Sequence, residues 1–497
     1  MQIDRTSTLR AVIAATIVSG AAVLACSDDS PTPPPPLLTR EQLMDPLACA
    51  SCHEKHYEEW SSSMHAYASD DPLFVAMNAR GQREAGIGDF CVRCHAPMAL
   101  REGATTTGEN LSELPAALRG VTCYFCHSVD GVEGTHNNPL RLADDGVMRG
   151  PLSDPAPNAV HASAYSPLLD RDQLASADMC GTCHDIVNDR GTHIERTFAE
   201  WQGSVYSQPL VGTTCGQCHM DQTTDLEPAA PGAEPRRLHD HRFPAVDLPL
   251  TPQPGEAELR AGVQELLDTS LQSALCVRGA EGAAQIQVVL DNVAAGHNWP
   301  SGAAQDRRAW VEVVAYVGDA VVYQSGVVPA SSSVTELEDP DLWLIRDCLF
   351  DDQGAETHMF WAAADYDTNL LPAQRTFDPS DPRFYQSHVY RNYPRSGALL
   401  DRYPDRVSMR VYLQPFGLDV FDDLVQSGDL VGTGDLGVEQ LRAQLTPLTV
   451  GEELVWSREA ATENYVEAGL PVACVSATNL LANADKVAAP EHSRCAP

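Results

Sequence analysis

The stretch Cys49-Ala50-Ser51-Cys52-His53 is the first of five copies of Cys-x-x-Cys-His, and these copies decide how the N-terminal half of the chain folds. Two cysteines separated by two residues and followed at once by histidine form the attachment signal for a c-type haem. The thiols add to the haem vinyl groups, and the histidine ligates the iron from the proximal side. The sequence therefore predicts five covalently attached haem c groups, each with its iron.

The predicted haem sites use the same three residues in every copy. The attachment cysteines are Cys49, Cys52, Cys91, Cys94, Cys123, Cys126, Cys180, Cys183, Cys215 and Cys218. The proximal iron ligands are His53, His95, His127, His184 and His219. Chance would give roughly 0.01 such patterns in a chain of this length. Zinc sites and disulfide or redox pairs also use Cys-x-x-Cys, but neither requires histidine directly after the second cysteine in every copy.

The chain is strongly acidic. Its 497 residues include 33 Lys and Arg against 69 Asp and Glu, which gives a formal net charge of −36. Only Lys55 and Lys486 are lysines, so arginine carries almost all of the positive charge. This balance argues against nucleic acid as a partner, because the phosphate backbone is anionic too. It favours redox partner proteins that dock through a basic patch, although the same charge could serve solubility alone.

The first 26 residues have the features of a bacterial lipoprotein signal peptide. Two arginines precede an apolar run at residues 11–24, which is short for a membrane span. The run ends in Val23-Leu24-Ala25-Cys26, which resembles a lipobox, so we expect cleavage before Cys26 and lipidation of its thiol. Plain secretion is the alternative, because Leu24 is unusual at its position. The Pro-rich linker 27–40 would then hold the protein off a membrane, in the periplasm or at the outer membrane or cell surface.

Four cysteines lie outside the five motifs and Cys26, all in the C-terminal half: Cys276, Cys348, Cys474 and Cys495. An even number of such cysteines in an exported protein predicts two disulfides, and three pairings are open. A bond between Cys474 and Cys495 would staple the Ala-rich tail. Unpaired buried thiols are the alternative.

The chain divides into two predicted domains. Residues 41–250 hold five haems in about 210 residues, which leaves too little chain per haem for a conventional core. We therefore expect a mainly-α and irregular multihaem domain, with short helices such as one over residues 54–65. An interdomain helix is predicted at 251–274, where leucine and valine recur at helical spacing. Residues 275–497 alternate apolar and polar residues in short runs, which predicts a mostly-β, sandwich-like domain.

Three stretches resemble one superfamily of proteins, the nitrification-type multihaem cytochromes c. The superfamily includes tetrahaem electron carriers and octahaem enzymes that act on hydroxylamine, nitrite and tetrathionate. The resemblance covers about residues 45–320 and implies a multihaem domain with an appended β-domain, but it does not choose between carrier and enzyme. The matching residues are Cys49 to His65 with Tyr57, Trp60 and Ser63, Cys180 to Met220 with Thr197-Phe198-Ala199-Glu200-Trp201, and Gly296-His297-Asn298-Trp299-Pro300-Ser301-Gly302.

The distal side of each haem decides what the protein does. A haem with imidazole on both faces suits electron transfer, whereas an open face can bind a small substrate. Four of the eleven remaining histidines match distal-ligand patterns that the resemblance implies: His65, His161, His241 and His297. Of these, His297 would reach the haems from the second domain. For a fifth distal ligand the candidates are His136 and His193, with the thioether of Met98 as a weaker one.

This supply of histidines favours an exported electron carrier with a chain of mostly bis-His haems, and no catalytic residue is assigned. The alternative is an oxidoreductase with one open haem that reduces or oxidises a small nitrogen or sulfur compound. A third reading is a β-domain scaffold with incidental haems. The chain has no Cys-x-x-Cys-Lys motif and no larger haem set, which known catalytic relatives have. Oligomers or filaments stay open.

Overall fold

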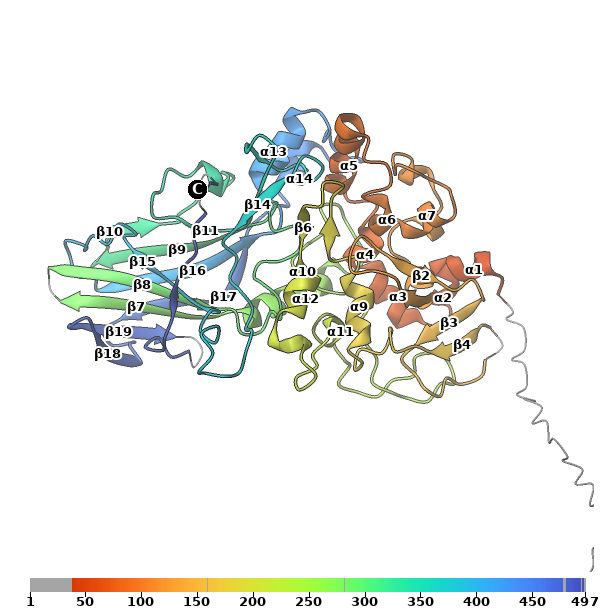
Figure 1. Cartoon of the computed structure of the whole chain (residues 1–497), viewed down its shortest axis with the longest axis horizontal. Helices are drawn as coiled ribbons and strands as arrows, with labels where there is room; N and C mark the ends of the chain where they lie inside the picture. Colours follow the sequence, from red (N-terminus) through yellow and green to blue (C-terminus); the bar gives the residue numbers. More distant parts are fainter. Residues whose placement is uncertain (1–37, 159, 281, 477–479, 493, 496–497) are drawn as a thin grey trace, which may run out of the picture.

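The computed structural model describes residues 38–495, apart from 159, 281, 477–479 and 493. The predicted signal peptide, Cys26 and most of the Pro-rich linker therefore lie outside the described residues. In Figure 1 residues 38 to about 220, coloured red to yellow, form one half of the molecule, and the large sheets lie in the other half. We call residues 38–255 the motif region and residues 256–495 the β region. Among the described residues, no helix is both long and apolar enough to cross a bilayer.

The motif region consists of short helices joined by irregular chain, as the sequence predicts. The α-helices are α1 (Arg40–Met44), α2 (Pro46–Ala50), α3 (Glu54–Ser61), α4 (Met64–Tyr67), α5 (Pro72–Ala85), α6 (Val92–His95), α7 (Pro97–Arg101), α8 (Cys123–His127), α9 (Ala175–Gly181), α10 (Thr197–Gln202) and α11 (Cys215–His219). The 3-10 turns are η1 (Leu111–Glu113), η2 (Ala116–Leu118) and η3 (Val205–Ser207).

Three two-stranded sheets complete the motif region. They pair β1 (Val129–Val132) with β2 (Leu140–Leu142), β3 (Val147–Gly150) with β4 (Ala162–Tyr165), and β5 (Ile186–Val187) with β6 (His193–Glu195). The apolar side chains between these elements form several small clusters. The largest cluster confined to this region has eight buried residues: Leu43, Met44, Met98, Tyr124, Phe125, Val129, Leu140 and Met179.

Helix α12 (Glu256–Ser270) connects the two regions and buries one apolar face, formed by Leu259, Val263 and Leu267. The sequence predicts that this helix continues to residue 274, and that boundary is wrong. Strand β7 starts at Gln272, because residues 272–280 pair with β8 on one side and residues 274–278 also pair with β19 on the other. Pairing on both sides satisfies the backbone donors and acceptors that a longer helix would otherwise have used.

Two large sheets form most of the β region. One has the order β18-β19-β7-β8-β15-β20, and the other has the order β10-β9-β16-β17 with β11 also paired to β9. A smaller sheet has the order β13-β12-β14. The strands are β7 (Gln272–Ala280), β8 (Ala283–Asp291), β9 (Arg308–Val317), β10 (Ala320–Ser325), β11 (Trp343–Ile345), β12 (Asp347–Phe350), β13 (Glu356–Thr357), β14 (Asp365–Thr368), β15 (His388–Tyr393), β16 (Arg406–Gln414), β17 (Leu448–Ser457), β18 (Glu463–Glu467), β19 (Leu470–Ser476) and β20 (Val487–Ala488).

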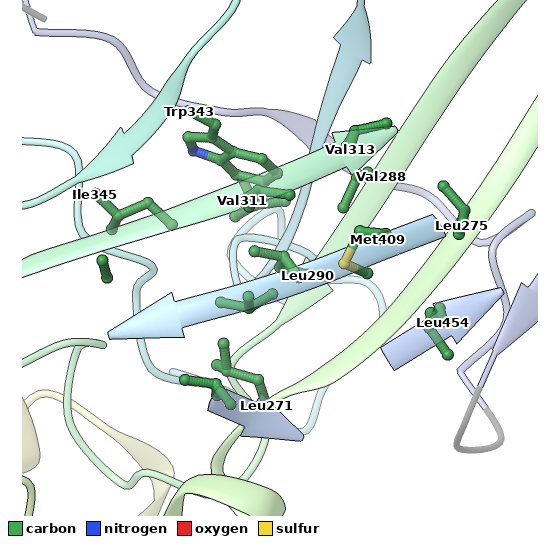
Figure 2. Packing of buried hydrophobic residues seen from close by; sticks show 14 of the residues in the cluster. Leu271, Leu275, Val288, Leu290, Val311, Val313, Trp343, Ile345, Met409 and Leu454 are labelled. Carbon is green, nitrogen blue, oxygen red and sulfur yellow. The ribbon is translucent and has the colours of Figure 1, made fainter. Parts of the chain in front are cut away.

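Side chains from both large sheets meet in one core of 30 buried residues, to which α12 also contributes. Leu275 and Leu290 come from one sheet, while Val311 and Met409 come from the other, and Trp343 lies over them (Figure 2). This packing of two sheets on a shared core agrees in outline with the predicted mostly-β domain. Two helices, α13 (Leu418–Gln426) and α14 (Val438–Arg442), and the turn η4 (Val334–Glu336) lie outside the sheets.

The four cysteines of the β region form two disulfides. Cys276 bonds to Cys474 across neighbouring strands, and Cys348 bonds to Cys495. The predicted disulfide between Cys474 and Cys495 is therefore wrong. Cys474 lies directly opposite Cys276 in the pairing of β19 with β7, so the register of the sheet selects its partner.

Candidate functional site

Each motif lies in or at the end of a short helix, which brings its cysteines and histidine together: the first and fourth motifs begin at the ends of α2 and α9, and the other three motifs form α6, α8 and α11. In the first motif the amide of His53 donates to the Cys49 carbonyl at 2.8 Å, and His95 and His184 donate to Cys91 and Cys180 at 3.2 and 3.3 Å. None of the ten motif cysteines forms a disulfide. The disulfide interpretation of the motifs therefore does not hold in the part of the chain that the structure describes.

The geometry also argues against zinc. A structural zinc ion needs four ligand atoms in a tetrahedron, with each bond about 2.0–2.3 Å long. Within the described ranges, one group has three or more ligand atoms all within 4.8 Å of one another, and it consists of Cys348, His492 and Cys495. It contains no motif residue, and two of its members are joined in a disulfide.

Four proximal histidines have the same hydrogen bond on the ring nitrogen that faces away from the motif. The Nδ1 atoms of His53, His95 and His219 lie 2.8, 3.0 and 2.7 Å from the carbonyls of Ala229, Ala68 and Pro244. The His127 Nδ1 lies 2.5 Å from the Arg149 carbonyl. A carbonyl partner fixes the proton on Nδ1 and leaves Nε2 free to ligate a metal.

Three of the four favoured distal histidines have an equivalent bond. The Nδ1 atoms of His161, His241 and His297 lie 3.1, 2.8 and 2.8 Å from the carbonyls of Ala162, His239 and Asn298. Nε2 is again the nitrogen left free. Proximal and distal rings thus share one arrangement, in which Nδ1 bonds to a carbonyl and Nε2 is left to bind iron. This arrangement fits axial ligation of iron.

Three of the favoured distal rings stand opposite a proximal ring. Ring centres are 6.3 Å apart for His53 and His161, and 6.2 Å apart for His65 and His184. His219 and His297 are 6.5 Å apart with planes at 11°. Two imidazoles on opposite sides of one metal ion, each bound at about 2 Å, have ring centres about 6 to 6.5 Å apart. The spacing of all three pairs therefore fits one haem iron between the rings.

The fourth distal candidate, His241, lies near the third motif. Burial lowers the pKa of His241 well below its usual value, and the neighbouring rings of His56 and His127 lower it further. His56 is in edge contact with His241, with ring centres 4.7 Å apart. Of these two histidines, His241 is the one with the Nδ1-to-carbonyl bond, so it is the better partner for His127.

Burial favours the neutral form of seven of the axial candidates. It lowers the pKa of His65 to about 3 and that of His184 to about 4, and nearby imidazoles add to both shifts. Burial also lowers the pKa of His53, His95, His127, His219 and His297. A neutral imidazole is the form that binds a metal, so the site is ready for ligation at neutral pH.

His95 and His127 both lack an imidazole at the spacing of the three pairs within the described chain. His241 and His56 lie near His127, but neither of them has this relation to His95. One face of the His95 ring stacks on Phe74, with centres 4.2 Å apart and planes at 10°. The haem of the second motif is therefore the one whose distal side lacks an evident histidine.

The two further candidates do not face His95 at that spacing. The rings of His136 and His193 stand 6.5 Å from each other, and the His193 Nδ1 is 3.8 Å from Asp185 Oδ1. Two other histidines are engaged elsewhere. The His388 Nδ1 is 2.6 Å from Asp291 Oδ2, and the His239 Nε2 is 3.1 Å from the Gln222 amide nitrogen. Met98 is fully buried within an apolar cluster.

Buried arginine atoms in the motif region fit the negative charge that haem propionates carry. Five side chains there keep a buried Nε with no hydrogen-bond partner: Arg93, Arg119, Arg171, Arg196 and Arg242. The Arg196 Nε lies 3.9 Å from Asp185 Oδ2, within ion-pair range. Buried donors are nearly always paired, so the other four atoms indicate an acceptor that the protein itself does not supply. Carboxylate is the acceptor that a guanidinium binds best.

The motifs touch one another in a branched order. The thiol of Cys49 is within hydrogen-bonding reach of Cys123, which joins motifs one and three. In the same way Cys94 reaches Cys183, and Cys180 reaches Cys215. Burial raises the pKa of the Cys126 thiol, and the nearby Cys180 thiol adds to this shift. The fourth motif thus neighbours the second, third and fifth motifs.

Sequence reasoning found the motif residues but missed what orients them. The carbonyls of Ala68, Ala229 and Pro244 are backbone groups, so no residue type signals them. The buried arginines carry no spacing pattern either. Only the fold brings these groups to the rings.

Known proteins resemble this chain in part of its sequence and in its fold. Residues 48–128, which span the first three motifs, match the family model described as cytochrome c554 and c-prime. The fold is similar to the crystal structure of a penta-heme cytochrome c552 from Thermochromatium tepidum, with a TM-score of 0.58 and 19% sequence identity. That alignment covers 84% of this chain and 99% of the other chain. No curated protein matches the sequence. The five motifs, the family match over residues 48–128 and the shared fold together support a multihaem c-type cytochrome that binds haem c covalently.

Proposed function

We propose that the protein is an exported pentahaem electron carrier in which most haems have histidine on both faces. The observation that carries this proposal is the spacing of 6.2–6.5 Å between three proximal rings and three distal ones. Six-coordinate haem iron has no free site for a substrate and suits electron transfer. The proposed axial pairs are His53 with His161, His127 with His241, His184 with His65, and His219 with His297.

The proposed electron path follows the contacts between motifs. The haem irons supply the chemistry by cycling between the ferric and ferrous states. Motif one neighbours motif three, and motif four neighbours motifs two, three and five. The fourth haem is therefore the proposed junction, reached from three sides.

A second candidate function rests on His95. Its distal side has no evident histidine among the described residues, and an open haem face can bind a small molecule. The protein would then reduce or oxidise a small nitrogen or sulfur compound at the second haem and use the other haems to deliver or remove electrons. We rank this function second, because the polar residues that would orient such a substrate are not identified.

The proposed partners and location of the protein follow from its net charge and from its N-terminal sequence. A net charge of −36 favours docking of redox partners through basic patches. A lipid on Cys26 would anchor the protein to a membrane facing an oxidising compartment, and the two disulfides of the β region fit such a compartment.

The number of haems is tested by a pyridine haemochrome assay combined with intact mass measurement of the purified protein. The proposal requires five covalent haems and full reduction by a low-potential donor that passes electrons on to a soluble acceptor. A count below five, or haems that stay oxidised while others are reduced, would contradict the electron-carrier proposal.

The second function is tested by adding nitrite, hydroxylamine or tetrathionate to the reduced protein. Carrier function alone predicts no oxidation of the haems faster than the protein-free background reaction. Rapid oxidation that is lost in the variant His95→Met, but kept in His193→Ala, would establish the second function instead.

A further inference from the structure

The motif region contains a short sequence repeat that lies outside the haem motifs. Tyr57-x-Glu59-Trp60-x-x-Ser63 follows the first motif, and Phe198-x-Glu200-Trp201-x-x-Ser204 follows the fourth. Both copies lie on the short helices α3 and α10 and extend just beyond them. In both, the serine hydroxyl donates back to the tryptophan carbonyl, at 2.7 and 2.8 Å.

The two tryptophans make the same contact with the next haem motif. Trp60 Nε1 donates to the Val121 carbonyl at 2.8 Å, and Trp201 Nε1 donates to the Thr213 carbonyl at 2.9 Å. Each acceptor lies two residues before a motif cysteine, Cys123 or Cys215. Each tryptophan therefore ties its helix to the start of a motif and so to the proximal side of that haem.

The two glutamates bind the chain that carries the distal histidine of the same motif. Glu59 Oε2 accepts the backbone N–H of His241 at 3.1 Å. Glu200 accepts the backbone N–H and the side-chain amide of Asn298, both at 3.2 Å, and the hydroxyl of Ser301 at 2.7 Å. Asn298 directly follows His297. In each copy, neighbouring residues thus contact the two sides of one haem site.

We infer that Glu59 and Glu200 are equivalent positioning residues, each holding one distal histidine against its proximal partner. Glu59 sets His241 opposite His127, and Glu200 sets His297 opposite His219. The inference rests on the axial pairs of the proposed function. It adds that the same arrangement of glutamate and tryptophan occurs twice, although one distal histidine comes from the motif region and the other from the β region.

A purely local role is the competing explanation, since both glutamates lie on short helices that could need them for packing. The two roles differ in what happens to the distal ligand. Loss of a purely local contact should lower the stability of the fold without affecting one haem more than the others. Loss of a positioning contact should let one particular histidine leave its iron. Carbon monoxide distinguishes them, because it binds ferrous haem only where an axial position is open.

The test is stopped-flow binding of carbon monoxide to the fully reduced protein. The reference variants His241→Ala and His297→Ala should each add one equivalent of fast-binding haem. Glu59→Ala and Glu200→Ala should each speed binding at one haem by about tenfold or more, the factor that corresponds to losing charge-assisted hydrogen bonds. The matched control is Glu58→Ala, which removes an exposed glutamate from the same helix as Glu59 and should leave the kinetics unchanged.

Double variants assign each glutamate to its haem. Glu200→Ala should add nothing in the His297→Ala background, whereas Glu59→Ala should still open a further haem there, because only contacting residues couple. If an alanine variant does not fold, the Glu→Gln variant replaces it, because glutamine keeps the side-chain shape and removes the charge. The Glu→Gln variants should change carbon monoxide binding at the same haems, but by a smaller factor.

Two results would overturn the inference in different ways. If the histidine variants gain carbon monoxide sites while the glutamate variants match Glu58→Ala, the glutamates have no positioning role and the axial pairs stand. If His241→Ala and His297→Ala gain no site, the axial pairs themselves are wrong, and the positioning role is lost with them.

Discussion

The two regions of the molecule differ in what fills their interiors. The β region buries 30 residues in one core that two sheets and a helix share. The largest cluster confined to the motif region has eight. The motif region nevertheless encloses imidazoles whose pKa is lowered by burial and buried arginine Nε atoms without hydrogen-bond partners. A domain of this size needs more buried apolar surface than these clusters supply, and in our account porphyrin supplies it.

The core of the β region is therefore made of side chains, whereas in our account the core of the motif region is made largely of cofactor. The two regions are joined by contacts such as Glu200 with Asn298 and Asn188 with the carbonyls of Phe360 and Ala363. Stability of the motif region should therefore depend on haem attachment, whereas stability of the β region should depend on its own packing.

The largest effect is expected when haem attachment at the fourth motif is blocked. The double variant Cys180→Ala, Cys183→Ala removes the haem that neighbours three others, and the motif region should lose its fold, a loss comparable to the whole stability of a domain of about 5–15 kcal/mol. Limited proteolysis with mass spectrometry should show cleavage throughout residues 38–255 and a resistant β region. Equal resistance of both regions would mean that haem is not the core of the motif region.

Truncating the core of the β region should have a smaller effect that stays local. Trp343 is fully buried between the sheets (Figure 2), so Trp343→Ala should cost about 3–5 kcal/mol in the free energy of unfolding. Urea denaturation followed by circular dichroism measures it. The exposed Val466→Ala is the matched control. A changed haem spectrum in the native Trp343→Ala protein would show that the two interiors are not independent.

The disulfide between β7 and β19 should contribute less than the core tryptophan. Cys276→Ala, Cys474→Ala should lower the free energy of unfolding of the β region by about 2–4 kcal/mol, because the bond restricts the unfolded chain. Thiol quantification with and without reductant checks the pairing. A free thiol on Cys276 in the native protein would contradict the observed bond.

The smallest effect concerns pH and one buried carboxyl group. Burial raises the pKa of Asp306 to about 7, and its Oδ1 has no hydrogen-bond partner. The folded protein therefore keeps a proton that the unfolded chain has lost, so stability should fall as the pH rises from about 4 to 7. Asp306→Asn cannot ionise and should gain about 1–3 kcal/mol relative to wild type on going from pH 5 to pH 8.

Thermal unfolding of both proteins across this pH range measures the difference. The exposed Asp319→Asn is the matched control and should follow wild type. Parallel curves for Asp306→Asn and wild type would show that Asp306 is ionised in the folded protein throughout.

The sequence predicted the haem attachment motifs, because Cys-x-x-Cys-His is a local pattern, and it predicted the two-part architecture in outline. It did not predict that the helix expected over residues 54–65 is interrupted, where Ser63 accepts the amide of Ala66 and starts α4. It did not predict where α12 ends or how the cysteines pair, because both depend on strand register between residues about 200 apart. The acceptors that orient the histidine rings are backbone carbonyls, and only tertiary structure brings them there.

Electron paramagnetic resonance of the oxidised protein, with the spins quantified, tests the central claim most directly. The account predicts four low-spin haems and one high-spin haem, with the high-spin haem lost in a variant that blocks attachment at Cys91 and Cys94. Parallel rings at His219 and His297 should give an ordinary rhombic signal, whereas the rings of His65 and His184, at 67°, should give a more anisotropic one. Two or more high-spin haems in the intact protein would contradict the proposed pairs, and five low-spin haems would contradict the open site at His95.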